Sequence, residues 1–132
     1  MDQFARHYFG MVFRERFNDA RGDNFQKLFG QIMNLRYPGD FTQTRPWGPL
    51  GDDKCDGYLP SQRKFYQCYA PDELEQKKTL DKLNKDFTGA LPYKGTYFTV
   101  WVFVHNARAG RVPSWLTLEL ERLRQAHIDI KI

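Results

Sequence analysis

The chain has 132 residues, enough for one domain with a modest hydrophobic core. Apolar residues make up 41% of it, which excludes an intrinsically disordered chain, and the lack of any run of about 18 apolar residues excludes a membrane-spanning helix. Twenty basic residues against sixteen acidic ones give a net charge of +4, a mild excess that permits a polyanionic partner without requiring one.

Two helices are expected first. The segment from about Asp2 to Asn18 has apolar residues at helical spacing, and its charges exclude a signal peptide, so we expect a cytoplasmic protein. Asp23 is expected to cap a second helix that runs to about Arg36. Aromatic residues surround the first helix on more than one face, which predicts that it buries two sides. These residues are Phe4, Tyr8, Phe9, Phe13 and Phe17.

A strand and a hairpin follow. Residues 40–47 contain strand-forming residues, and Pro46 indicates an edge strand or a strand end. Residues 51–71, "GDDKCDGYLPSQRKFYQCYAP", predict a hairpin with its turn at "PSQR". This register pairs Leu59 with Lys64, Tyr58 with Phe65, Gly57 with Tyr66, Asp56 with Gln67, Cys55 with Cys68 and Lys54 with Tyr69.

Side chains alternate along a strand, so this register assigns each of these residues to one face. One face is expected to carry Lys54, Asp56, Tyr58, Phe65, Gln67 and Tyr69. Cys55 and Cys68 are expected to share the other face as buried thiols, which oxidation would join and cytosolic conditions keep reduced.

The second half of the chain alternates helices and strands. Residues 71–87 predict a helix with Pro71 in its first turn, and residues 97–106, "YFTVWVFVHN", predict a strand covered on both faces. Residues 112–126 predict a helix, and the final "IDIKI" predicts a strand. The fold class is therefore α/β, with a mixed central sheet of an antiparallel hairpin plus crossover strands, flanked by helices. Because the chain ends within this apolar strand, we expect residues 1–132 to be one domain at the N-terminus of a longer protein.

The first hairpin face combines a carboxylate, an amide and an ammonium group. Asp56 and Gln67 offer oxygen ligands of the kind that Mg²⁺ prefers. Lys54 lies where it could orient an attacking water or neutralise the charge of a pentavalent phosphate. On residue types alone, an exposed polar sheet face with a Lys–Asp pair accounts for the same pattern.

The hairpin, with the preceding helix "NFQKLFGQIMNLRYPGDF", resembles the core of the restriction-endonuclease-like (PD-(D/E)XK) superfamily. It is most similar to the branch that includes modification-dependent restriction enzymes, in which an aspartate ends one strand near glycines and the next strand carries Q-x-K or E-x-K. The resemblance covers about residues 20–132 and implies an α-β-β-β-α-β fold, with Asp56 as the metal-binding aspartate and Gln67 as the second ligand. The chain also resembles modules at the N-termini of multidomain bacterial proteins in anti-phage defence loci.

One position departs from the superfamily pattern. The lysine expected two residues after Gln67 is Tyr69, a phenol that is neutral at pH 7. Two interpretations follow: Lys54 replaces the lysine from across the hairpin, or the site is inactive and the domain only binds.

Several residues are candidates for substrate binding. Arg45 and Trp47 combine a cation with an aromatic ring, which can hold a phosphate and stack on a base, although core packing also accounts for Trp47. Arg63 and Lys64 at the hairpin tip, together with Tyr69, would flank the site. These residues favour nucleic acid as the partner, and DNA over RNA.

Three functions are consistent with these patterns. The first is a Mg²⁺-dependent nuclease that cuts DNA with a metal-activated water. The second is a non-catalytic module of the same fold that recognises nucleic acid or protein within a larger assembly. The third is an oligomerisation domain, which the aromatic first helix favours.

Overall fold

The computed structural model describes residues 2–43, 55–107 and 111–132. Its elements are α1 (Gln3–Asp19), α2 (Gly22–Arg36), β1 (Gly57–Leu59), η2 (Pro60–Gln62), β2 (Lys64–Tyr69), α3 (Gln76–Ala90), η3 (Leu91–Tyr93), β3 (Val100–His105) and α4 (Ser114–Ala126).

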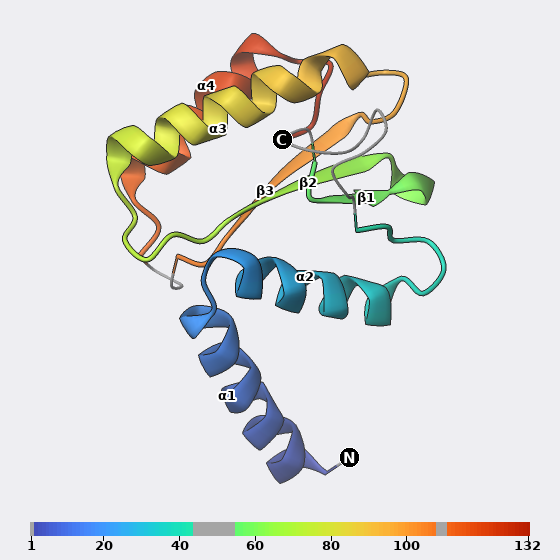
Figure 1. Cartoon of the computed structure of the whole chain (residues 1–132), viewed down its shortest axis with the longest axis vertical. Coiled ribbons are helices and arrows are strands. Elements are labelled where there is room, and N and C mark those ends of the chain that lie inside the picture. Colours follow the sequence, from blue (N-terminus) through green and yellow to red (C-terminus); the bar gives the residue numbers. More distant parts are fainter. Residues whose placement is uncertain (1, 44–54, 108–110) are drawn as a thin grey trace.

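The described strands form a mixed sheet in the order β1-β2-β3. β1 and β2 are an antiparallel hairpin, and β3 runs parallel to β2 after the α3 crossover. Isolated bridges from Thr42 to Tyr58 and from Lys131 to Val100 extend both edges. Helices α3 and α4 cover one face of the sheet, α2 lies on the other, and α1 projects from the body (Figure 1). The predicted α/β class with helices on both faces is confirmed.

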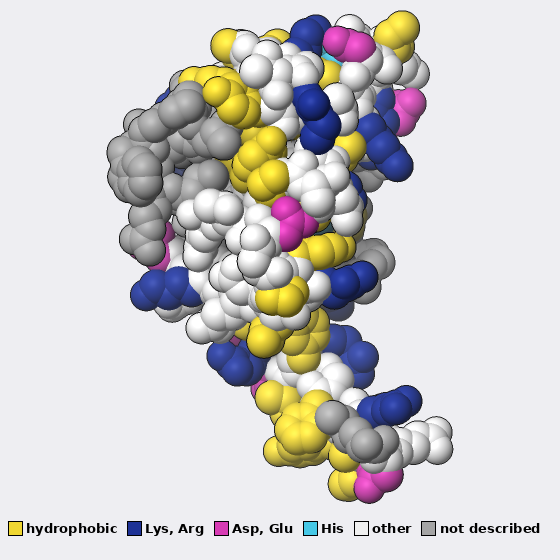
Figure 2. Space-filling model, turned by 90° about the vertical axis from the view of Figure 1, so that its right-hand side faces the viewer, with side chains coloured by type: hydrophobic (Ala, Val, Ile, Leu, Met, Phe, Trp, Pro, Cys, Tyr) yellow, Lys and Arg dark blue, Asp and Glu magenta, His cyan; other side chains and the backbone are white. Residues whose placement is uncertain are grey.

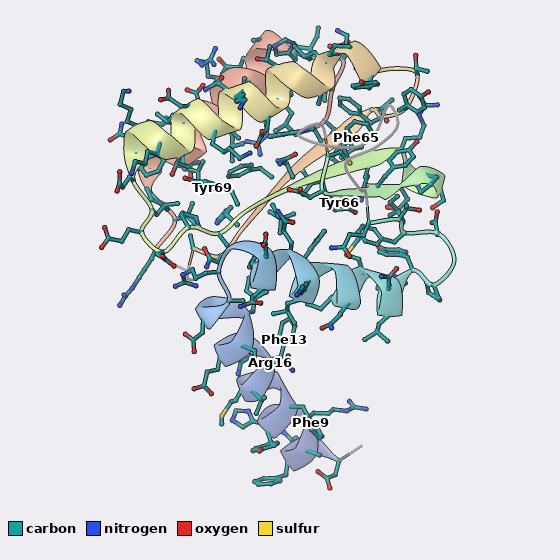
Figure 3. All side chains as sticks on the ribbon, in the orientation of Figure 1. Phe9, Phe13, Arg16, Phe65, Tyr66 and Tyr69 are labelled. Carbon is teal, nitrogen blue, oxygen red and sulfur yellow. The ribbon has the colours of Figure 1, made fainter. Side chains whose placement is uncertain are left out.

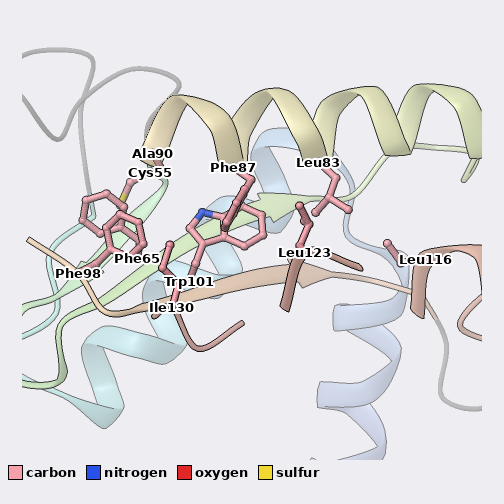
Figure 4. Packing of buried hydrophobic residues seen from close by; sticks show 10 residues of the cluster. All are labelled: Cys55, Phe65, Leu83, Phe87, Ala90, Phe98, Trp101, Leu116, Leu123 and Ile130. Atoms are coloured by element: carbon pink, nitrogen blue, oxygen red, sulfur yellow. The ribbon is translucent and has the colours of Figure 1, made fainter. Parts of the chain in front are cut away.

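Each face of the sheet has its own hydrophobic core. On the α3/α4 side, the Trp101 ring packs edge-on against Phe87 at 5.2 Å between ring centroids. Leu83 and Leu123 lie beside this pair, and Leu116 extends the same cluster (Figure 4). On the α2 side, the larger buried side chains are Phe25, Phe29, Phe41, Leu59 and Tyr66. Full burial of one such side chain stabilises the fold by about 1.5–3 kcal/mol before chain entropy is subtracted, so these cores hold the sheet between its helices.

Among the element boundaries that differ from the sequence prediction, three have a clear structural reason. Helix α2 begins at Gly22, whose N–H donates to the Ala70 carbonyl at 2.9 Å, so Asp23 lies inside the first turn rather than at the cap. Helix α3 begins at Gln76 and not at Pro71, because the chain first rises from the end of β2 to the helical layer (Figure 1). In the final "IDIKI" the residue that pairs with β3 is Lys131, since a turn that bonds the Ile130 N–H to the His127 carbonyl precedes it.

Candidate functional site

The hairpin has the predicted register in its strand residues. Gly57 pairs with Tyr66, Tyr58 with Phe65, and Leu59 with Lys64. The 3₁₀ turn η2 closes the hairpin, and Arg63 follows it with φ 53°, in the left-handed region that makes the sharp return to β2.

A β-bulge interrupts the hairpin at Asp56. The Asp56 N–H donates to the Tyr66 carbonyl at 2.7 Å, while Gly57 is the Cα partner of Tyr66, so two residues of one strand oppose one residue of the other. The bulge was not predicted from the sequence, although a glycine inside a strand is a recognised signal for one. Gly57 also fits because a Cβ there would lie 2.5 Å from the Phe41 ring.

The bulge corrects the prediction that Cys55 faces Cys68. One extra residue reverses the side-chain alternation upstream of the bulge. Cys55 therefore packs with Phe65, Phe98 and Ala90 on the α3/α4 side (Figure 4), whereas Cys68 lies in the α2-side core. The two buried thiols therefore lie on opposite faces of the sheet, and the Cys55 thiol donates to the Gly57 carbonyl at 2.7 Å. Burial raises the pKa of the Cys68 thiol, and the Asp56 carboxylate adds to the rise, so this thiol stays protonated.

The structure brings Asp56 and Gln67 together, as predicted. The Asp56 Oδ2 atom accepts from Gln67 Nε2 at 3.0 Å and from the Cys68 backbone N–H at 2.7 Å. The carboxylate thus takes the place of a strand carbonyl at the bulge and satisfies a donor of β2. Charge-assisted bonds to two donors make Asp56 a structural clamp across the hairpin.

Gln67 is inaccessible from the surface. Its side chain is 3% exposed, and its Oε1 atom is buried with no hydrogen-bond partner in the described structure. Mg²⁺ is usually held by carboxylates together with several waters. Within residues 2–43, 55–107 and 111–132, no group of three or more His, Cys, Asp or Glu side chains gathers to hold a metal. The two candidate metal ligands in the described structure are a carboxylate already bonded across the hairpin and a buried amide, and this pair fits Mg²⁺ poorly. The Mg²⁺ site stays a prediction.

The tyrosines on this face have structural contacts. The Tyr69 ring stacks on Phe103 with 6.0 Å between centroids (Figure 3 shows Tyr69 on β2), and the Tyr58 hydroxyl donates to the Tyr97 carbonyl at 2.7 Å. Three further predicted site residues, Lys54, Arg45 and Trp47, lie outside the described residues. Their proximity to Asp56 therefore stays a prediction.

The basic residues at the hairpin tip serve the fold. The Arg63 guanidinium donates to the Gly95 carbonyl, and the Arg63 carbonyl accepts from the backbone N–H groups of Thr99 and Val100. Lys64 is half-buried and lies between its partners on β1 and β3. The role of both residues in substrate binding stays a prediction.

The carboxyl ends of β2 and β3 anchor the junction between α1 and α2. Asn106 Nδ2 donates to the Ala20 carbonyl at 2.9 Å, beside the Gly22–Ala70 bond. His105 Nδ1 accepts from the Ala107 N–H at 3.2 Å, and burial lowers the pKa of this imidazole. These polar groups hold the chain where α1 leaves the body.

Helix α1 presents a second candidate surface. Its exposed large apolar side chains are Phe4, Tyr8, Phe9, Met11 and Phe13. Figure 2 shows hydrophobic side chains gathered over the projecting helix, and Figure 3 shows Phe9 and Phe13 far from the sheet. A groove of about 540 Å³ lies between the end of α1 and α2, where Glu15, Asp19, Arg16 and Lys27 mix both signs of charge.

Comparisons with family models, curated proteins and solved structures found no match to this chain. Among the helices of the described residues, none combines the length and apolar character needed to cross a membrane. The site geometry is therefore the basis for assigning a function.

Proposed function

We propose that the chain is a non-catalytic recognition and assembly module with a restriction-endonuclease-like fold, and that it recognises protein through α1. The observation that carries this proposal is the exposure of Phe4, Tyr8 and Phe9, at 80%, 51% and 57%. Apart from Phe13, the other aromatic residues in the described part of the chain are buried or half-buried. A contiguous exposed apolar surface on a folded domain is typical of a protein interaction site.

The order of elements supports a nuclease-like ancestry. After α2 come three neighbouring extended segments, at Thr42, β1 and β2, and then α3 and the parallel strand β3. This order agrees with the α-β-β-β-α-β core that the resemblance implies. Gln67 lies in the third of these segments, as in the superfamily pattern, whereas Asp56 directly precedes the second segment and does not end a strand.

The contacts of the hairpin favour binding over catalysis. The Asp56 carboxylate bonds Gln67 and a backbone N–H of β2, and the Gln67 carbonyl oxygen is buried. Both side chains therefore have a structural task that needs no metal. A Mg²⁺-dependent nuclease is the second candidate, and the 3.0 Å contact within the Asp56–Gln67 pair is the observation that favours it.

Protein is a better partner than nucleic acid for this module. The Arg63 guanidinium bonds a backbone carbonyl, and on α3 the Lys77 and Lys78 ammonium groups pair with acids of the same segment. A phosphate-binding surface needs free cations in a continuous track. The exposed face of α1 is instead aromatic, which suits a protein partner.

A cleavage assay separates the two candidates. Supercoiled plasmid is incubated with Mg²⁺ or Mn²⁺ and with wild type, Asp56→Ala or Lys54→Ala, and Glu15→Ala is the control on α1. We expect the plasmid to stay intact with all four proteins. Nicking by wild type that both hairpin variants lose and Glu15→Ala keeps would establish the nuclease and contradict our proposal.

A size measurement tests the assembly role. The chain is followed by gel filtration of lysate from cells that make it, as wild type and as the double variant Tyr8→Ser/Phe9→Ser. We expect wild type to elute above the monomer mass and the double variant to elute at that mass. Leu118→Ser is the matched control because Leu118 is 69% exposed on α4. A wild-type chain of monomer size would overturn the proposal.

A further inference from the structure

The first three turns of α1 form one broad apolar face. A helix turns by about 100° per residue, so residues seven apart, such as Ala5 and Val12, lie on the same side. These two short side chains occupy the middle of the face. Its borders are Phe4, Tyr8 and Met11 on one side and Phe9 and Phe13 on the other, and the opposite side carries Gln3, Arg6, His7, Gly10 and Arg14.

The described chain leaves most of this face uncovered. Helix α1 meets the body at its carboxyl end, where the Phe17 ring lies 5.1 Å from the Phe25 ring and Asn106 bonds the Ala20 carbonyl. The preceding turns project away from the sheet and its helices (Figure 1). Asp2 caps the projecting end by accepting from the Ala5 N–H at 2.7 Å, so the helix is well formed where it stands alone.

We propose that α1 of a second copy of this chain covers the face, in an antiparallel helix pair. This inference rests on the proposed function, because it names the partner of the same surface. An antiparallel pair related by a two-fold axis between Tyr8 and Phe9 places Ala5 of one copy opposite Val12 of the other. Short side chains then meet in the centre, where the backbones approach, and aromatic rings close the borders from both sides.

The exposed area suits a dimer. An aromatic side chain carries about 150–250 Å², and the five exposed side chains of the face are between 46% and 80% exposed. Together they offer on the order of 500 Å² per copy, so a pair that covers the whole face buries on the order of 1,000 Å², which is the lower limit for a specific interface.

The charges of α1 also suit a second copy. From Asp2 to Asp19 the acids Asp2, Glu15 and Asp19 balance the arginines Arg6, Arg14 and Arg16, although the whole chain carries +4. The segment is therefore neutral, and two copies meet there without net repulsion. An antiparallel arrangement adds a favourable term, because the positive end of each helix dipole lies beside the negative end of the other.

Sedimentation equilibrium of the purified full chain tests the pairing. We expect a monomer–dimer equilibrium whose dissociation constant rises at least tenfold in Tyr8→Ser/Phe9→Ser and is unchanged in Leu118→Ser. Far-ultraviolet circular dichroism of the double variant should retain the helical signal of wild type at the same concentration of monomer. A wild-type chain that stays monomeric up to about 100 times the protein concentration of the lysate experiment would overturn the pairing.

Cysteine cross-linking tests the direction of the pair. Phe9→Cys lies next to the two-fold axis and should form a disulfide with its own copy under mild oxidation. Ala5→Cys should link poorly to itself but efficiently to Val12→Cys when the two variants are mixed. Efficient self-linking of Ala5→Cys indicates a parallel pair and overturns the antiparallel arrangement. Cys55 and Cys68 are buried, so the wild-type background should be low.

The two proposals fail in different ways. A purified chain that is monomeric, but whose size in lysate still depends on Tyr8 and Phe9, overturns the second copy as the partner and leaves the assembly function standing with a different protein. A chain that is monomeric in both settings overturns both.

Discussion

Phe25 and Phe29 on α2 have the same four-residue spacing as Phe9 and Phe13 on α1, yet the two pairs have opposite environments. Phe25 is fully buried and Phe29 is 8% exposed, whereas Phe9 and Phe13 are 57% and 46% exposed. The α2 pair meets its partner inside the chain, where the Phe29 ring lies 5.4 Å from the Tyr66 ring on the sheet. The α1 pair has no comparable cover in the described part of the chain.

The difference teaches what hydrophobic periodicity can establish. A helical apolar pattern indicates that a face needs a partner, and it does so equally for both helices. Whether that partner lies in the same chain depends on where the helix leaves the body, and the bonds from Gly22 to Ala70 and from Asn106 to Ala20 decide that for α1. The body and α1 should therefore respond differently to matched substitutions.

Phe25→Ala against Phe9→Ala is the strongest test of this difference. Phe25→Ala should lower the free energy of unfolding by about 3–5 kcal/mol, because it leaves a cavity in the α2-side core. Phe9→Ala should change it by less than about 0.5 kcal/mol. Urea denaturation at low protein concentration measures both. Equal losses would show that α1 packs against its own body and would break the comparison.

Asp56→Ala against Glu15→Ala compares two carboxylates. Asp56→Ala leaves the Cys68 N–H and the Gln67 amide without their acceptor, which should cost about 1–3 kcal/mol. Glu15 is exposed on α1, so its removal should be close to neutral. Asp56→Asn, which keeps an acceptor oxygen, should recover part of the loss in the same urea measurement. A neutral Asp56→Ala would contradict the structural clamp.

The hairpin shows how far sequence reasoning reached. Turn position and side-chain alternation predicted the pairing of Gly57 with Tyr66 and of Leu59 with Lys64, because a closed turn fixes the register of both strands. The contact between Asp56 and Gln67 was predicted as well. The face of the sheet on which Cys55 lies was not predicted, because the extra residue of the bulge reverses the direction of the side chains that precede it.

The environments of Arg63 and Gln67 could not be predicted from the sequence for a different reason. The Arg63 guanidinium bonds a carbonyl 32 residues further along the chain, at Gly95, a contact that its place at the hairpin tip does not predict. Gln67 was expected on an open face, but it is buried. A polar residue in a strand has the same pattern whether water, a ligand or a distant backbone group satisfies it, and tertiary packing makes that choice.

Gly57→Ala against Gly10→Ala compares two glycines. A Cβ on Gly57 would lie 2.5 and 2.8 Å from atoms of the Phe41 ring, so Gly57→Ala should destabilise the fold by about 1–3 kcal/mol. Gly10 lies within α1, and the nearest atom to a Cβ there is Arg14 Nη1 at 3.8 Å, so Gly10→Ala should stabilise the helix by about 0.5–1 kcal/mol. Thermal unfolding measures both, and shifts of the same sign would contradict the contrast between the sheet and α1.

The smallest expected effect is on the pH dependence of stability. It is measured by comparing His105→Gln at the end of β3 with His7→Gln on α1. Burial lowers the pKa of His105 below its ordinary value of about 6.5. As the pH falls, the unfolded chain therefore takes up this proton before the folded chain does. The stability that the neutral imidazole contributes is complete above about pH 6.5 and is lost as the pH falls through the folded pKa.

Protonation also removes the lone pair of Nδ1 that accepts from the Ala107 N–H, at the strand end that anchors α1. Urea midpoints between about pH 7.5 and pH 5 should fall for wild type and for His7→Gln, whose side chain is exposed on α1, with the same slope. His105→Gln should fall less steeply over this range. If its slope equals that of wild type, His105 takes up its proton equally easily in the folded and unfolded chain, and the carboxyl end of β3 is as open to water as the face of α1.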